Sequence, residues 1–193
     1  MLTQLAQMLY PPACILCSRR MMKTSAVICP SCERGCSLLL PPLCQRCGLP
    51  LRGAYDLVTL CQRCTSAPSA FDRARAPFLY RDTICEAMRA FKYRNRHRLG
   101  RWLAEAMAHT TLTALPLQQF DRVVAMPLYW LKRRLRGWNP AEALAVELAQ
   151  MLGVPYHARA VRRIRWTTSQ TRLTPTQRQR NVREAFRAQP ETL

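Results

Sequence analysis

The chain has 193 residues, 49% of them hydrophobic, which is enough for a small metal-stabilised module plus one domain of about 120 residues with its own core. Its 30 basic and 11 acidic side chains give a formal net charge of +19, which excludes an acidic surface and makes anions such as nucleic acid the first partners to consider. No run of eighteen uncharged apolar residues occurs, and the opening MLTQLAQMLYPP lacks the basic start and cleavage site of a secretory signal, so we expect a soluble, cytoplasmic protein without a membrane partner.

The first 70 residues contain four Cys-x-x-Cys pairs and little helical periodicity, a pattern typical of a segment folded around metal. Both thiolates of such a pair reach one ion from a single tight turn, and two pairs complete the closed tetrahedral shell of a structural zinc site. We therefore predict two structural zinc ions, bound by Cys14, Cys17, Cys29, Cys32, Cys44, Cys47, Cys61 and Cys64. Cys36 and Cys85 fall outside the pattern and are expected to be small buried apolar residues.

The spacing of the pairs predicts how they share the two ions. Eleven residues separate Cys17 from Cys29 and thirteen separate Cys47 from Cys61, each about the length of a short ribbon hairpin, which favours a tandem arrangement of first with second and third with fourth. A cross-braced arrangement, first with third and second with fourth, uses the same ligands and stays open. Disulfides are the alternative to metal, and the missing secretory signal disfavours them because disulfides persist in oxidising compartments.

The basic excess lies in the second part of the chain. Residues 1–70 hold only seven of the 30 basic and two of the 11 acidic side chains, and eight thiolates on two Zn²⁺ ions would cancel most of that positive charge. Residues 71–193 therefore carry the net charge, mostly as arginine, whose planar fork suits phosphate and diphosphate. A solvated basic surface without a ligand is the alternative interpretation.

From residue 71 the sequence pattern changes to alternating strands and helices. Strands are predicted at 74–81, 122–127 and 161–166, and helices at 84–93, 99–107, 140–152 and after a capping pattern at Thr174. The third helix has both ends marked, because Asn139 is a suitable N-cap, Pro140 suits the first helical position and Gly153 supplies a stop. The alternation favours an α/β fold with a largely parallel sheet, and two domains, residues 1–70 and 71–193.

Ligands of such sheets bind beyond the carboxyl ends of the strands, where loops meet helix N-termini. This rule selects the segment PLYWLKRRLRGWN, predicted as a loop between the strand ending at Pro127 and the helix capped by Asn139. Its basic side chains predict an anion site, with a solvated basic loop as the alternative: Lys132, Arg133, Arg134 and Arg136. The segment 166–186 is a second candidate, but taken alone it is only a polar loop.

The order of these motifs resembles the ComF family of late-competence proteins over nearly the whole chain: four Cys-x-x-Cys pairs, FKYRNRHRLGRWLA, RVVAMPLYWLKRRLRGWN and TTSQTRLTPTQRQRNVREAF. The most specific elements are RGWN at 136–139, where the family usually reads RGFN, and Ser169-Gln170 followed by RQRNVREAF. Trp138 in place of Phe is a mild departure. The resemblance implies an N-terminal double zinc ribbon joined to a type I phosphoribosyltransferase-like domain.

The resemblance also implies a site for 5-phosphoribosyl 1-diphosphate with Mg²⁺. The turn at 126–128 and the RGWN loop would face the diphosphate, and the segment 167–186 would form a mobile hood over the reacting centre. The implied roles are leaving-group contact for Arg136 and Arg180 and orienting hydrogen bonds for Gln170 and Asn181. The full set of expected substrate-binding residues is Arg136, Gly137, Asn139, Gln170, Arg180 and Asn181.

Family members continue into a hydrophobic strand, two adjacent acidic residues and a Thr-Thr-Gly phosphate loop, whereas this chain reaches Leu193 first and has no glycine after Gly153. The expectation is therefore an incomplete, truncated transferase-like domain with no transferase activity in the 193-residue form, for which Mg²⁺ and the ribose diphosphate matter only if the domain is complete. The absent strands would leave apolar side chains exposed at Val123, Val124, Ile164 and Trp166.

Three functional hypotheses follow. The first is a ComF-like phosphoribosyltransferase-domain protein linked to DNA uptake in natural transformation. The second is a single-stranded DNA binding module that uses the zinc ribbons and the basic surface. The third is a structural module that docks a protein partner, such as the competence helicase machinery.

Overall fold

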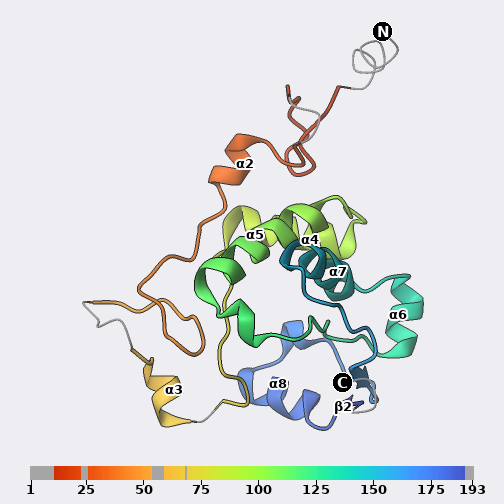
Figure 1. The fold of residues 1–193 in the computed structure, drawn as a ribbon. Helices are drawn as coiled ribbons and strands as arrows, with labels where there is room; N and C mark the ends of the chain where they lie inside the picture. The colour runs from red at the N-terminus through yellow and green to blue at the C-terminus, as the bar shows by residue number, and fades with distance from the viewer. Residues whose placement is uncertain (1–10, 23–25, 54–58, 68, 190–193) are drawn as a thin grey trace. The chain divides into compact units, whose positions relative to one another are not determined.

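The computed structural model describes residues 11–22, 26–53, 59–67 and 69–189, and most of the opening segment MLTQLAQMLYPP, on which the prediction about a secretory signal rests, lies outside them. The chain forms two compact units, Met1–Leu117 and Gln118–Leu193 (Figure 1). The predicted division into domains 1–70 and 71–193 remains a prediction. The boundary between the two compact units, after Leu117, lies further along the chain than the predicted domain boundary. No helix among the described residues is long and apolar enough to cross a membrane.

In the first unit, two short helices each begin directly after the first cysteine of a Cys-x-x-Cys pair and contain the second, α2 at Pro30–Arg34 and α3 at Gln62–Ser66. The segment predicted as a strand at 74–81 makes one antiparallel bridge, between Phe78 and Leu38. Around this bridge the Leu39 N–H donates to the Pro77 carbonyl and the Leu79 N–H to the Ser37 carbonyl, both at 2.9 Å. These bonds tie the ribbon segment to the residues that lead into the helices.

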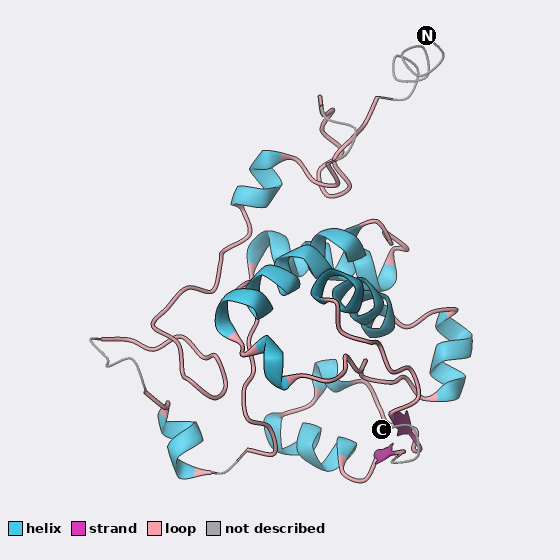
Figure 2. Cartoon of the chain, in the orientation of Figure 1, coloured by secondary structure: helices cyan, strands magenta, loops and turns pink. Residues whose placement is uncertain are grey.

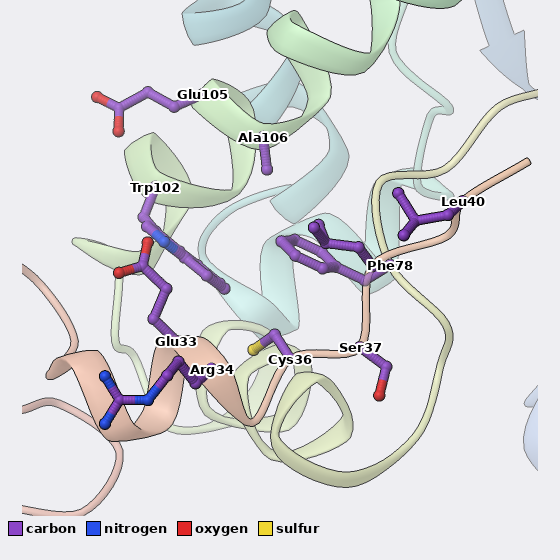
Figure 3. A pocket seen from close by; sticks show the side chains of 10 residues that line it. Glu33, Arg34, Cys36, Ser37, Leu40, Phe78, Trp102, Glu105 and Ala106 are labelled. Carbon is purple, nitrogen blue, oxygen red and sulfur yellow. The ribbon is translucent and has the colours of Figure 1, made fainter.

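Two longer helices complete the first unit and confirm the predicted helical periodicity, α4 at Asp82–Tyr93 and α5 at Leu99–Ala114. Phe91 of α4 and Leu99 of α5 are fully buried. Gly100 permits the close approach, because a Cβ there would lie 3.1 Å from Phe91 Cε2. On the ribbon side, the Phe78 ring stacks on the Trp102 indole with a centroid distance of 5.6 Å (Figure 3). The short 3-10 helix η1 follows at Leu117–Gln119.

The second unit contains helix α7 at Pro140–Leu152, whose predicted ends are confirmed by an Asn139 N-cap and by Gly153 in the left-handed conformation at φ 66°. The preceding segment, predicted as a loop, contains helix α6 at Trp130–Arg136. The loop prediction was wrong there because Leu, Lys and Arg are good helix formers, and Gly137 ends the helix at φ 79°.

Strand content in the second unit is small (Figure 2). Strands β1 at Val161–Arg163 and β2 at Phe186–Ala188 form a two-stranded antiparallel sheet in which Arg162 faces Arg187. Between them lie the 3-10 helix η2 at Gln170–Arg172 and helix α8 at Pro175–Val182, which starts with the predicted capping box of Thr174 and Gln177.

The predicted parallel sheet is not confirmed. In the described part of the chain the segment 122–127 makes a single parallel bridge, between Val123 and Tyr156. The fold is a mixture of helices with a small antiparallel sheet. Without flanking strands, Val124, Ile164 and Trp166 remain exposed, as predicted, while Val123 is half-buried.

Candidate metal centres and basic groove

The eight cysteines of the predicted zinc sites form two separate clusters in the tandem grouping. In each cluster the four sulfur atoms lie within 4.8 Å of one another. The first cluster contains Cys14, Cys17, Cys29 and Cys32, and the second contains Cys44, Cys47, Cys61 and Cys64. The structure thus groups the first Cys-x-x-Cys pair with the second and the third pair with the fourth, which is the tandem arrangement.

The sulfur positions fit a tetrahedral zinc ion. Tetrahedral ligands at the usual Zn–S distance of about 2.3 Å lie about 3.8 Å apart. The sulfurs of Cys14 and Cys32 are separated by 3.8 Å, and those of Cys17 and Cys29 by 3.6 Å. In the second cluster the Cys47 to Cys61 distance is also 3.6 Å. The donor set and its dimensions therefore suit two closed Cys₄ zinc sites.

The same backbone hydrogen bonds build both clusters. In the first, the Ser18 N–H donates to the Cys14 carbonyl at 2.9 Å and the Cys29 N–H to Cys14 Sγ at 3.3 Å. In the second, Gly48 and Cys61 donate to the corresponding atoms of Cys44 at 2.9 Å and 3.3 Å. The two ribbons thus have the same local structure, in which backbone turns position the sulfur atoms.

The residue after the first Cys-x-x-Cys pair of each ribbon has a left-handed backbone. Ser18 has φ 59° and Gly48 has φ 69°. Position 48 favours glycine for two reasons. Its backbone is left-handed, and a Cβ there would lie 2.6 Å from the Ala74 carbonyl oxygen. The second ribbon therefore packs more closely against the chain that follows it.

The electrostatics of the clusters call for a cation. Burial raises the pKa of Cys14, but backbone N–H donors from Cys17, Cys29 and Leu16 outweigh it and bring the pKa down to about 6. Cys44 has the same balance and also reaches about 6. Burial and neighbouring sulfurs raise the pKa of Cys64 to about 12 and also raise the pKa of Cys32.

The opposite shifts have different causes, since backbone N–H donors lower the pKa of Cys14 and Cys44, whereas burial and neighbouring sulfurs raise the pKa of Cys32 and Cys64. Backbone donors lower the pKa of Cys14 and Cys29 in the first cluster and of Cys44 in the second, and a divalent ion would allow the remaining sulfurs to ionise as well.

The two remaining cysteines stand apart from the clusters. Cys36 is buried, its thiol donates to the Cys32 carbonyl at 3.4 Å, and burial together with the Glu33 charge raises its pKa. Cys85 is half-buried on α4. The expectation of a buried residue is therefore met by Cys36 and only partly by Cys85.

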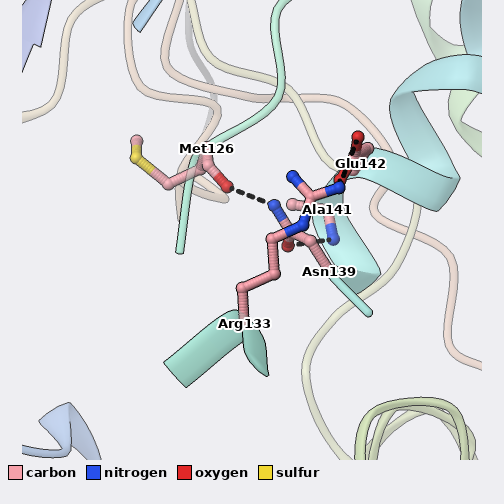
Figure 4. A network of polar contacts seen from close by, with 5 residues as sticks. All are labelled: Met126, Arg133, Asn139, Ala141 and Glu142. Carbon is pink, nitrogen blue, oxygen red and sulfur yellow. Dashed lines mark hydrogen bonds and ion pairs between the residues drawn. The ribbon is translucent and has the colours of Figure 1, made fainter. Parts of the chain in front are cut away.

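The RGWN loop is held together from within (Figure 4). The Asn139 side chain accepts a hydrogen bond from the Ala141 N–H and donates to the Met126 carbonyl, both at 3.1 Å. Arg133 forms an ion pair with Glu142 at 3.1 Å. Asn139 is buried, so its amide positions the loop and the start of α7. Gly137 supplies the turn between the helices, and Arg136 is half-buried at the end of α6.

The expected hood residues form a separate network. Asn181 donates to the Thr168 carbonyl at 3.0 Å and accepts from the Thr168 hydroxyl at 3.2 Å, which fastens the segment to α8. The Gln170 carbonyl accepts from Arg178 at 3.0 Å, while its side-chain oxygen is buried without a hydrogen-bond partner in the described part of the chain. Arg180 is exposed on α8. Asn139 and Asn181 are therefore held by different partners.

A groove of about 620 Å³ in the second unit gathers basic side chains that the sequence analysis did not single out. We call it the basic groove; its lining includes Trp130, Arg133, Arg159, Arg162 and Arg163. Only Arg133 belongs to the predicted anion site. The signal that could have found the others is the run HARAVRRIRW at 157–166, which places arginines around a short strand.

Aromatic rings accompany these cations. Trp130, at the mouth of the groove, is 60% exposed. Tyr129 meets the Trp166 ring edge-on at 5.7 Å, and Lys132 Nζ lies 5.5 Å from the Trp166 ring centre. Arg163 stacks over the Phe186 ring at 5.2 Å, and its Nε is buried without a partner among the described residues. Guanidinium groups and exposed rings together can hold a phosphate backbone and stack on bases.

Comparisons with known proteins agree with these features. Residues 5–65 match the double zinc ribbon domain family. The chain is 30% identical over 182 residues to the DNA utilization protein YhgH of Salmonella typhi, covering 92% of this chain and 78% of that protein. It is 28% identical over 180 residues to the protein of that name in Escherichia coli strain K12, covering 92% and 78%.

A further relative is the Competence protein F of Haemophilus influenzae, 24% identical over 176 residues, covering 90% of this chain and 75% of that protein. No solved structure shows significant similarity to the chain.

Proposed function

The chain belongs to the ComF family, and from that premise we propose that it handles DNA during uptake or utilisation, binding single-stranded DNA in the basic groove. Relatives of this chain carry the names DNA utilization protein and Competence protein F. Those names support a role with DNA, and they do not identify the residues that contact it.

The observation that carries the proposal is the composition of the basic groove. Arg159 and Arg162 are exposed and line the groove together with the exposed ring of Trp130, and Arg133 and Arg163 line it as well. Arginines neutralise backbone phosphates, and an exposed aromatic ring stacks on an unpaired base. Bases in a duplex are already stacked on one another, so this combination favours single-stranded DNA.

The zinc ribbons serve the proposal as a scaffold. Each Cys₄ shell is closed, which leaves no open coordination position for a substrate or an activated water. In this proposal zinc stabilises each ribbon, as a hydrophobic core would in a larger domain, and has no catalytic role. The proposed setting is the cytoplasm, because eight zinc-binding thiolates need a reducing compartment.

The phosphoribosyltransferase-like fold of the second unit is part of the same proposal. It is supported by the parallel bridge of Val123 with Tyr156 and by α7, which follows the 122–127 segment through the RGWN loop. The ribose diphosphate site and its Mg²⁺ stay a prediction, and the Asn139 amide is occupied at both ends while Glu142 is paired with Arg133. We therefore derive no transfer step.

The test is DNA affinity as a function of salt, measured by fluorescence anisotropy with a labelled oligothymidylate of about 20 nucleotides and the zinc-loaded protein. The double variant Arg159→Gln/Arg162→Gln should bind about tenfold or more weakly and flatten the salt dependence by up to about two counterions. Both arginines are exposed, so the fold is preserved.

The matched control is Arg89→Gln/Arg98→Gln, which removes the same charge from exposed arginines of the first unit. It should leave the affinity within about twofold of the parent. Equal losses in both double variants would mean that binding is diffuse and that the basic groove is not the DNA site.

A further inference from the structure

The first unit has a groove of different chemistry. It encloses about 770 Å³ between α2, the segment that follows α2, Phe78 and α5 (Figure 3). The stacked rings of Phe78 and Trp102 form one wall. Leu38 and Leu40 line it while being 58% and 65% exposed. We call this the apolar groove. Apolar side chains exposed side by side in a concavity are typical of a surface that binds another protein.

The apolar groove extends to the first zinc ribbon. A smaller adjoining cavity of about 210 Å³ shares Glu33, Trp102 and Glu105 with it and continues to the ribbon segment at 26–28. The concave surface therefore continues from Phe78 to the first zinc ribbon.

The charged residues that line the apolar groove and its adjoining cavity are Glu33, Arg34, Arg101 and Glu105. Glu105 is already paired with Arg101 at 3.2 Å. Glu33 has no ion pair among the described residues, although the chain has 30 basic side chains against 11 acidic ones. In the close view the Glu33 side chain extends beside the Trp102 indole (Figure 3). A free carboxylate next to an aromatic ring is a site for a cation.

From this combination we propose that the apolar groove binds a segment of a partner protein in which a large apolar side chain neighbours an arginine or lysine. The apolar side chain would pack on Leu38, Leu40 and Phe78, and the cation would pair with Glu33 over the Trp102 ring. The apolar lining of the groove suits a segment of protein rather than a phosphate backbone.

The groove is preformed and depends on the first zinc site. Its ribbon wall is fixed by the hydrogen bonds around the Leu38 to Phe78 bridge. Its other wall, α2, begins directly after Cys29 and contains Cys32, both members of the first sulfur cluster. A preformed site loses little conformational entropy on binding, which favours recognition of a short segment.

The experiment selects phage-displayed random peptides of about twelve residues on the zinc-loaded full chain, and measures the affinity of the synthetic consensus peptide. The consensus should contain Arg or Lys next to a large apolar residue. Glu33→Gln and Leu40→Ser should each weaken its binding about tenfold or more, since one removes the charge partner and the other the apolar contact. Both side chains are exposed, so neither change disturbs the core.

Glu86→Gln on α4 is the matched control, because it also removes one carboxylate from the first unit and should leave peptide affinity unchanged. Zinc content is measured for each variant to show that the ribbon is intact. The proposal is overturned if the selected peptides lack a basic residue, or if they bind Glu33→Gln and Leu40→Ser as tightly as the parent chain.

Discussion

Asn139 uses both ends of its side-chain amide inside the protein, one on the Ala141 N–H and the other on the Met126 carbonyl. The residue caps α7 and ties that helix to the preceding extended segment. Asn181 has a comparable role toward Thr168. Residues whose polar groups are satisfied in this way position a loop, whereas arginines at the surface remain able to contact an anion.

We expect Asn139→Ala to lower the free energy of unfolding by about 1–2 kcal/mol, because α7 loses its cap and the Met126 carbonyl loses the Asn139 donor. Urea denaturation of the zinc-loaded protein measures this change. Gln150→Ala, at an exposed position of the same helix, is the control and should stay within about 0.5 kcal/mol of the parent. Equal effects of the two substitutions would show that the Asn139 contacts do not stabilise the fold.

At the residue scale, the sequence predicted chemistry best where it depends on local spacing. The zinc ligands and the capping residues Asn139, Pro140 and Gly153 follow from short motifs. A capping residue bonds to backbone groups a few positions away, and the two cysteines of each pair are only three positions apart. The basic groove was missed because Arg159 and Arg162 meet Trp130 only through tertiary structure, which spacing along the chain does not encode.

The two zinc ribbons repeat one set of backbone hydrogen bonds, and each gathers its four sulfurs from a continuous stretch of chain. Each ribbon is therefore an independent metal-binding element. The tandem and cross-braced arrangements predict different losses of zinc when two cysteines are replaced. In the tandem arrangement the first pair shares its ion with the second pair, whereas in the cross-braced arrangement it shares its ion with the third.

The double variant Cys17→Ser/Cys29→Ser should retain one zinc ion, since both substitutions fall in the first cluster. Cys17→Ser/Cys47→Ser should retain none, because each cluster then lacks a ligand. Native mass spectrometry of the purified proteins counts the bound ions. A cross-braced protein would give the opposite pattern, with no zinc in the first variant and one ion in the second.

At the element scale, helices were predicted better than strands. The periodicity of α4, α5 and α7 spans three or more turns each and is confirmed, because an amphipathic helix forms its hydrogen bonds within itself. The segments at 74–81 and 122–127 make one bridge each, since a strand needs a neighbour that its own sequence does not supply. The segment 128–138 was misjudged as a loop because its helix is only seven residues long.

On the scale of the whole molecule, the two compact units carry grooves of contrasting chemistry. The basic groove of the second unit combines arginines with an exposed tryptophan, and the apolar groove of the first unit combines leucines and aromatic rings with the Glu33 carboxylate. One suits single-stranded DNA and the other a segment of protein. A ComF-family chain with both would hold a DNA strand while attached to a partner.

The most direct test of this account is photo-crosslinking of the zinc-loaded protein to a single-stranded oligonucleotide that contains 5-iodo-deoxyuridine, with the attached peptides mapped by mass spectrometry. We expect cross-links at Trp130 and in the segment 158–166, because these residues line or border the basic groove. Cross-links confined to the ribbon residues 11–67 would place the DNA on the zinc ribbons and contradict the account.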